Sequence, residues 1–198
     1  MTDDDVVEAV RRHVTGRVLP PATPQALAEA EASIGCPLPP LLRRLYSEVT
    51  NGGFGPGQGI LGVRGGRPQG NFYDITDLHQ EGPDPSGKIP AGFVLLHDWG
   101  CTIWSIADFR DPAAPMWCNH MGAVWPQGIT LAQWLLDTVT GTLTVEKLLE
   151  TQPSPVTRAS VSAQVSGAIG SRPWPPPRRV APAPLRAARP RGGRSPRP

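Results

Sequence analysis

Two histidines and two cysteines in the middle of the chain are the residues whose types could build a metal centre. His97, Cys101, Cys118 and His120 fall on neighbouring predicted strands, and two ligands from each strand could in principle bind zinc tetrahedrally. The spacing argues against zinc, because a predicted hairpin turn at Gly100 separates the first two and neither pair has the CxxC spacing of a zinc knuckle. We therefore predict no metal and no cofactor.

The same side chains make a weak case for a nucleophilic enzyme. Cys101 beside a histidine could mimic a thiol–imidazole pair, but no oxyanion-hole segment and no third orienting group is visible. Asp74, Asp77 and Asp98 could act as paired carboxylates, yet nothing in the sequence fixes their separation. We predict that the protein is not an enzyme.

A glycine-rich segment invites comparison with phosphate-binding loops. Gly55, Gly57 and Gly59 form a GxGxG pattern. No predicted strand leads into this pattern and no helix leads out of it, and that context is what makes such glycines meaningful. We predict no phosphate site here.

Charge is divided sharply along the chain. All 17 acidic residues lie at or before Glu150 together with ten of the 19 basic residues, so residues 1–150 carry a net charge of −7. Residues 151–198 contain nine arginines and no acidic residue, a net charge of +9. The overall net charge of +2 therefore describes neither part.

The two parts also differ in composition. Residues 151–198 are rich in Pro, Arg, Ser and Ala and have almost no large apolar side chain, so burial could not offset the entropy of ordering them. We predict a folded domain over residues 1–150 and a disordered basic tail over residues 151–198. The tail would make weak, salt-sensitive contacts with nucleic acid or an anionic surface.

Export and membrane insertion are not indicated. No run of about 18 apolar residues is present, and the MTDDDVVEAV start is acidic where a secretory signal is basic. The three cysteines have no disulfide-framework spacing and fit small buried thiols in a reducing compartment. We expect a cytoplasmic protein without a membrane span.

Periodicity predicts helices at both ends of a β-rich centre. Apolar spacing, caps and proline or glycine breaks predict helices over residues 3–15, 24–34 and 40–49 before the centre, and over 131–139 and 145–150 after it. Alternation predicts strands over 92–99, 101–107 and 115–120, with a loop from Gly122 onward. Residues 60–63 could add a strand, and residues 72–78 a strand or a helical turn. The fold class is α+β, a mostly antiparallel sheet with N-terminal and C-terminal helices packed around it.

One stretch resembles a known family. Residues 34–54 read IGCPLPPLLRRLYSEVTNGGF, with an Ile-Gly step, an LPP restart, a helix bearing leucine and tyrosine, and an NGGF exit. Together with WGCTIW at 99–104 and a Trp-bearing helix at 131–138, this order resembles the SUKH superfamily. That superfamily comprises the Smi/Knr cell-wall-assembly regulators and many bacterial immunity proteins. The resemblance covers about residues 20–150.

The resemblance implies a binding protein, in this case an immunity protein that neutralises a cognate toxin. An acidic domain suits a basic toxin such as a nuclease, because opposite charge steers the encounter. Trp125, which precedes Pro126 in the predicted loop, is the tryptophan expected to be exposed. The residues predicted to contact the partner are acids and tryptophans from loops and sheet ends: Asp74, Asp77, Glu81, Asp98, Trp99, Asp108, Asp111 and Trp125.

Two other functions stay open at this point. A regulatory scaffold, like the eukaryotic members that the family includes, would hold partners through its groove and tail without inhibiting them. A cysteine- or zinc-dependent enzyme would use the thiols and imidazoles named above.

Overall fold

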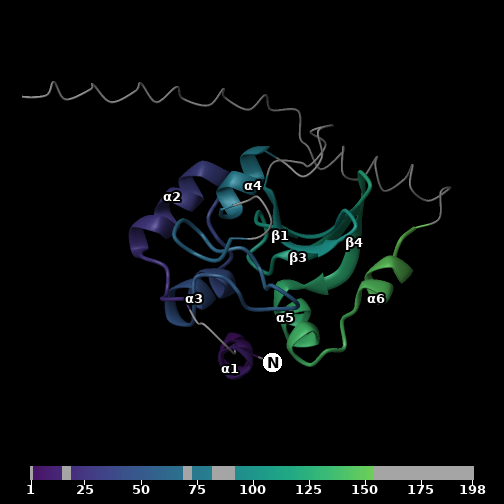
Figure 1. The fold of residues 1–198 in the computed structure, drawn as a ribbon, viewed down its shortest axis with the longest axis horizontal. Coiled ribbons are helices and arrows are strands. Elements are labelled where there is room, and N and C mark those ends of the chain that lie inside the picture. The colour runs from purple at the N-terminus through teal and green to yellow at the C-terminus, as the bar shows by residue number, and fades with distance from the viewer. Residues whose placement is uncertain (1, 15–18, 69–72, 82–91, 154–198) are drawn as a thin grey trace, which may run out of the picture.

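The structure is a computed structural model that describes residues 2–14, 19–68, 73–81 and 92–153. Most of the predicted tail lies outside these residues. The helices within them are α1 (Asp3–His13), α2 (Pro24–Ile34), α3 (Pro40–Glu48), α4 (Ile75–Glu81), α5 (Leu131–Val139) and α6 (Val145–Glu150). The strands are β1 (Phe93–Gly100), β2 (Ile103–Asp108), β3 (Pro115–His120) and β4 (Ala123–Thr130). The predicted α+β class is confirmed (Figure 1). None of the described helices is long and apolar enough to cross a membrane.

The strands form one antiparallel sheet in the order β1-β2-β3-β4, so each strand pairs with the next along the chain. The predicted loop after Gly122 is wrong, because residues 123–130 form β4 and pair with β3. Pro126 and Gly128 made this segment read as a loop. An edge strand tolerates proline, since its outer N–H groups need no partner.

Residues 60–63 do not form a strand, although this segment does reach the sheet. The N–H of Leu61 donates to the carbonyl of Leu96 on β1 at 3.1 Å. Residues 75–81 form helix α4, which settles the open choice for the segment around residues 72–78 in favour of a helix from Ile75 onward.

Proline, glycine and hydroxyl residues set the helix ends. Thr23 caps α2, with Pro24 in its first turn, and Gly35 ends it in the left-handed conformation at φ 83°. Thr130 caps α5 by accepting from the N–H of Gln133. The Gln133 side chain does not complete a reciprocal capping box, because its amide donates to the Asp137 carboxylate at 2.8 Å instead.

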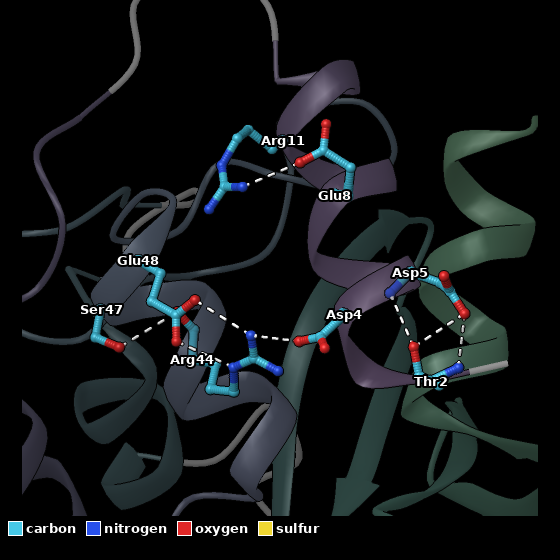
Figure 2. Close-up of polar contacts among 8 residues, drawn as sticks. All are labelled: Thr2, Asp4, Asp5, Glu8, Arg11, Arg44, Ser47 and Glu48. Atoms are coloured by element: carbon cyan, nitrogen blue, oxygen red, sulfur yellow. Dashed lines mark hydrogen bonds and ion pairs between the residues drawn. The ribbon is translucent and has the colours of Figure 1, made fainter.

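Helix α1 packs against α5 and α3 (Figure 1). Its buried face consists of Val6, Val7 and Val10. Figure 2 shows the polar side of this contact, where the Arg44 guanidinium on α3 pairs with Asp4 at 2.9 Å and with Glu48 at 3.0 Å. These ion pairs are exposed and contribute little free energy, so the buried valines hold α1 in place.

The core lies between the sheet and the helices. Tyr46 on α3 is fully buried in it, and its hydroxyl donates to the carbonyl of Leu61 at 2.7 Å. This bond anchors the long loop after α3 to the helix that precedes it. Burial raises the pKa of Tyr46 far above its ordinary value, so the hydroxyl stays a donor at all working pH values.

We predict that Tyr46→Phe lowers the free energy of unfolding by about 1–2 kcal/mol, because it leaves the buried Leu61 carbonyl without its donor. Urea denaturation of the full chain measures this. Tyr73→Phe is the matched control, since Tyr73 is 77% exposed and its loss should change stability by less than about 0.5 kcal/mol. Equal effects of the two changes would contradict the assigned role of Tyr46.

Candidate functional site

The loop after α3 is held by close backbone packing around Asn51. Its side-chain Oδ1 accepts from the N–H of Val63 at 2.8 Å, and its Nδ2 donates to the Val63 carbonyl at 3.2 Å. A Cβ on Gly52 would come within 2.5 Å of the Gly62 nitrogen, and a Cβ on Gly66 within 2.5 Å of the Asn51 Oδ1. The two arms of the loop therefore approach as closely as only glycine permits.

A second contact fixes the tip of this loop against the sheet. The N–H of Gly53 donates to the Ile60 carbonyl at 2.8 Å, and a Cβ on Gly59 would overlap the backbone of Gly53. The imidazole of His97 on β1 lies 3.0 Å from the Gly59 carbonyl through Nδ1, which must carry the proton because a carbonyl only accepts. His97 is only 2% exposed, so this bond joins loop and strand from the inside.

Trp99, two residues further along β1, is locked in one orientation. Its indole N–H donates to the Ser105 hydroxyl at 2.8 Å, and the same hydroxyl accepts from the Trp134 indole of α5 at 3.2 Å. The Trp99 ring also meets the ring of His97 edge to face, with centroids 4.9 Å apart. The Trp99 ring also lies against the Trp134 ring, with centroids 6.2 Å apart. Because the indole is half-buried and held at these three points, little rotamer freedom is left to lose on binding a partner.

Loop tip and strand end together form an open groove of about 400 Å³. Asp98 is one of its lining residues, and its carboxylate accepts from the N–H of Gly100 at 2.7 Å. The residues that line the groove are Pro56, Gly57, Gln58, His97, Asp98, Trp99 and Gly100. A fixed tryptophan in such a groove is typical of surfaces that bind another protein.

Comparison with known proteins decides the family. The family model described as SMI1 / KNR4 family (SUKH-1) matches residues 21–128, slightly more than half of the 198-residue chain. The chain belongs to this family. No curated protein matched in the second comparison. The matched segment of the SUKH-1 family contains every residue of the groove, whereas α1, α5 and α6 lie outside it.

Within this SUKH-1 fold, Asp98 and Trp99 are the predicted contact residues that line the groove. Asp74 is buried, and its Oδ1 accepts from the N–H groups of Thr76 and Asp77, so it serves as the cap of α4. Asp77 is half-buried and accepts from the N–H of Tyr73 at 3.0 Å. Glu81 is the last residue of α4, and its side chain lies outside the described part.

Two further residues that we predicted to contact the partner lie at the other end of the sheet. Asp108 pairs with Phe93 across the strands, whereas Gly100 pairs with Ile103, so the length of β1 separates Asp108 from the groove. Its carboxylate is held by Arg110 at 2.6 Å and 2.7 Å. Asp111 is exposed and accepts from the N–H of Ala113 in the following turn.

The prediction that Trp125 is exposed is wrong. Trp125 is only 1% exposed, because it lies on β4 and α6 covers it, with Leu148 in the same small apolar cluster. Its indole N–H donates to the Thr151 hydroxyl, which also accepts from Gln127. Thr151, which the sequence placed in the tail, therefore packs with the domain.

The thiols and imidazoles are spread over different environments. Cys118 is buried, and burial raises the pKa of its thiol to about 12, which keeps it protonated. The expectation of three buried thiols is wrong for Cys101, which is exposed at the β1–β2 turn with φ 50°. Among the described residues, no group of three or more His, Cys, Asp and Glu side chains is placed to hold a metal ion.

Sequence reasoning missed what orders the groove. We considered Asn51 only as a residue that ends a helix, although an asparagine before two glycines also fits a residue whose side chain holds a tight loop together. His97 was considered as a ligand, whereas its ring holds the Gly59 carbonyl. The role of Ser105 could not be predicted, because nothing about a serine between apolar strand residues indicates that its hydroxyl accepts from two indole N–H groups.

We predict that Gly59→Ala disrupts the loop and Gly57→Ala does not. Both glycines have positive φ, 79° and 56°, so alanine costs each about 1–2 kcal/mol of conformational strain. Only at Gly59 would the new Cβ also overlap backbone, whereas nothing lies within 4 Å at Gly57. Urea denaturation should show the larger loss for Gly59→Ala. Equal losses of unfolding free energy in the two variants would mean that the close approach of Gly59 to Gly53 does not restrict position 59 to glycine.

We predict that the free energy of unfolding falls as pH drops from about 7 to 5.5. Burial lowers the pKa of His97 and of His79 below the ordinary value of 6.5, despite the opposing effects of the Gly59 carbonyl and Asp98 on His97. As pH falls, the two histidines therefore bind protons more readily in the unfolded chain than in the folded one. The free energy of unfolding decreases once the pH is below the histidine pKa of the unfolded chain. Denaturation across this range should show a smaller loss in His97→Asn, which keeps an amide donor. His79→Asn measures the separate share of His79, and an unchanged slope in His97→Asn would contradict the buried, neutral imidazole.

Proposed function

We propose that this protein is an immunity protein that binds a cognate basic toxin and neutralises it by covering its working surface. The observation that carries the proposal is the groove between residues 56–58 and 97–100, which a fixed indole lines on an acidic domain. Membership in the SUKH-1 family supports it, because that family includes binding and immunity proteins. Binding alone would suffice for this role.

Local ion pairs strengthen the electrostatic case. Six of the ten basic residues in residues 1–150 are arginines paired with acids of the same domain: Arg11, Arg12, Arg43, Arg44, Arg64 and Arg110. These cations are therefore occupied by intramolecular partners. The surplus of acids gives the domain its net charge of −7, and a basic partner would be attracted over a distance of about 10 Å.

We place the centre of the interface at Asp98 and Trp99. Rigid tryptophans are the residues that most often dominate binding energy, provided that their surroundings exclude water. Asp77 would add rim charge, which changes the association rate more than the lifetime of the complex. Asp111 lies at the far end of the sheet, so it would add only to the long-range attraction. Asp74 and Asp108 are committed to the α4 cap and to Arg110, so we assign them no direct share.

The experiment pairs the purified full chain with any basic toxin that a neighbouring gene encodes. We predict inhibition that is complete at a 1:1 ratio, and an association rate that falls about tenfold or more between 50 and 500 mM NaCl. Stopped-flow fluorescence of the tryptophans measures the rate, and a toxin-activity assay measures the inhibition. A toxin from an unrelated gene neighbourhood is the control.

Absence of inhibition at micromolar protein would count against an immunity function. A rate that does not respond to salt would contradict the electrostatic part alone.

A further inference from the structure

The groove is connected to the part of the domain from which the C-terminal residues leave. Trp99 lines the groove and also packs against the small apolar cluster around Leu148 of α6, as does the half-buried Leu143. Thr151, directly after α6, accepts from the Trp125 indole of the same cluster at 3.1 Å. Trp99 therefore links the groove to the place where the chain continues toward residue 154.

We propose that this groove takes a proline-rich segment of the chain itself, residues 173–178, which read PWPPPR. The proline rings would stack on the part of the Trp99 indole that the groove leaves exposed. Docking of this segment needs no toxin. Its regulatory consequence, that the segment and the toxin compete for one groove, rests on the function proposed above.

The chemistry of this segment suits a groove that a fixed tryptophan lines. Pro175, Pro176 and Pro177 are the only three consecutive prolines in the sequence. Consecutive prolines favour the extended polyproline II helix, which docks in aromatic-lined grooves at low entropic cost. A segment too poor in apolar residues to form its own core can still become ordered on a surface that is already formed. The Trp99 indole is such a surface, because its bond to Ser105 fixes it.

The polar groups of the groove are matched to a run of prolines. Proline has no N–H, so such a run offers only carbonyl oxygens as hydrogen-bonding groups. Gln58 is exposed in the lining, and its side-chain amide can donate to one of these oxygens. Gly57 is also exposed, and a Cβ there would meet nothing within 4 Å, so the entrance is open. The groove volume of about 400 Å³ lies within the range of ligand-binding pockets.

Charge favours docking of the chain's own segment. Residues 1–150 carry a net charge of −7 and residues 151–198 a net charge of +9, so the two parts attract each other. Helix α6, whose Leu148 belongs to the cluster beside Trp99, carries the exposed acids Glu146 and Glu150 against one lysine. Arg178 ends the proline run and brings positive charge to this acidic surface.

The connecting chain is long enough for the segment to reach the groove. Pro173 follows Pro153 by 20 residues. A random coil of that length spans roughly 25 Å on average, whereas a domain of about 150 residues has a radius of gyration of about 15 Å. The tether would keep the segment near the groove at an effective concentration in the millimolar range, so a weak contact suffices.

The test needs no toxin, so its outcome is separate from that of the proposed function. The indole N–H signals of the full chain are followed by ¹H–¹⁵N NMR. Changing Pro175→Ala, Pro176→Ala and Pro177→Ala together should move the Trp99 signal. The matched control changes three other prolines of residues 151–198 to alanine, Pro182, Pro184 and Pro190, and should leave the Trp99 signal in place. An unmoved signal in the first variant, or equal movement in both, would overturn the proposal.

A peptide with the sequence of residues 172–178, acetyl-RPWPPPR-amide, gives the second measurement. Added to the variant without prolines 175–177, it should return the Trp99 signal toward its position in the parent chain. It should bind the parent chain at least about threefold more weakly, because the chain's own segment competes. The same peptide with alanine at the three consecutive prolines should not move the signal. Equal affinity for parent and variant would overturn docking within the chain.

Dilution separates docking within one chain from docking on a second copy. The Trp99 signal of the parent chain should be the same at about 20 µM and about 500 µM protein, because a tethered segment docks independently of concentration. A signal that shifts with concentration would mean that the segment binds another copy, and would overturn the assignment to the same chain.

Discussion

The contact on which the rest depends is the close approach of two backbone segments around Asn51. Its side chain takes the place of a strand partner for Val63, and Gly52, Gly62 and Gly66 remove every Cβ that would force the segments apart. This contact, with the Tyr46 and Leu96 bonds to Leu61, sets the path of the loop and brings its tip to His97. The NGGF exit after α3 is therefore a loop-packing device as much as a helix stop.

A short series of buried polar and aromatic contacts connects this loop to the groove and holds both in place. Gly59 bonds His97, whose ring meets Trp99, and Trp99 shares the Ser105 hydroxyl with Trp134 of α5. Each group is buried or half-buried, so losing one partner leaves a costly unsatisfied atom. Gly59, His97, Trp99 and Ser105 all lie within the residues that the family model matches, whereas Trp134 on α5 lies outside them.

Local rules predicted most of the fold, because proline, glycine and threonine act within a few residues. The ends of α2 and the hairpin at Gly100 follow from such punctuation. The same reasoning failed for β4, where Pro126 lies in an edge strand, and so misplaced Trp125. The groove was only half visible in the sequence, since Gly59 and His97 are 38 residues apart and only tertiary packing joins them.

Hydrogen exchange of the full chain, with and without the basic toxin that the proposed function assigns to it, tests the central claim most directly. Slower exchange in the toxin complex over residues 53–60 and 97–102, with residues 108–114 at the far end of the sheet unchanged, is the result that our account predicts. Protection confined to the far end, or to the α2–α4 side, would contradict it, because the partner would then bind away from the groove.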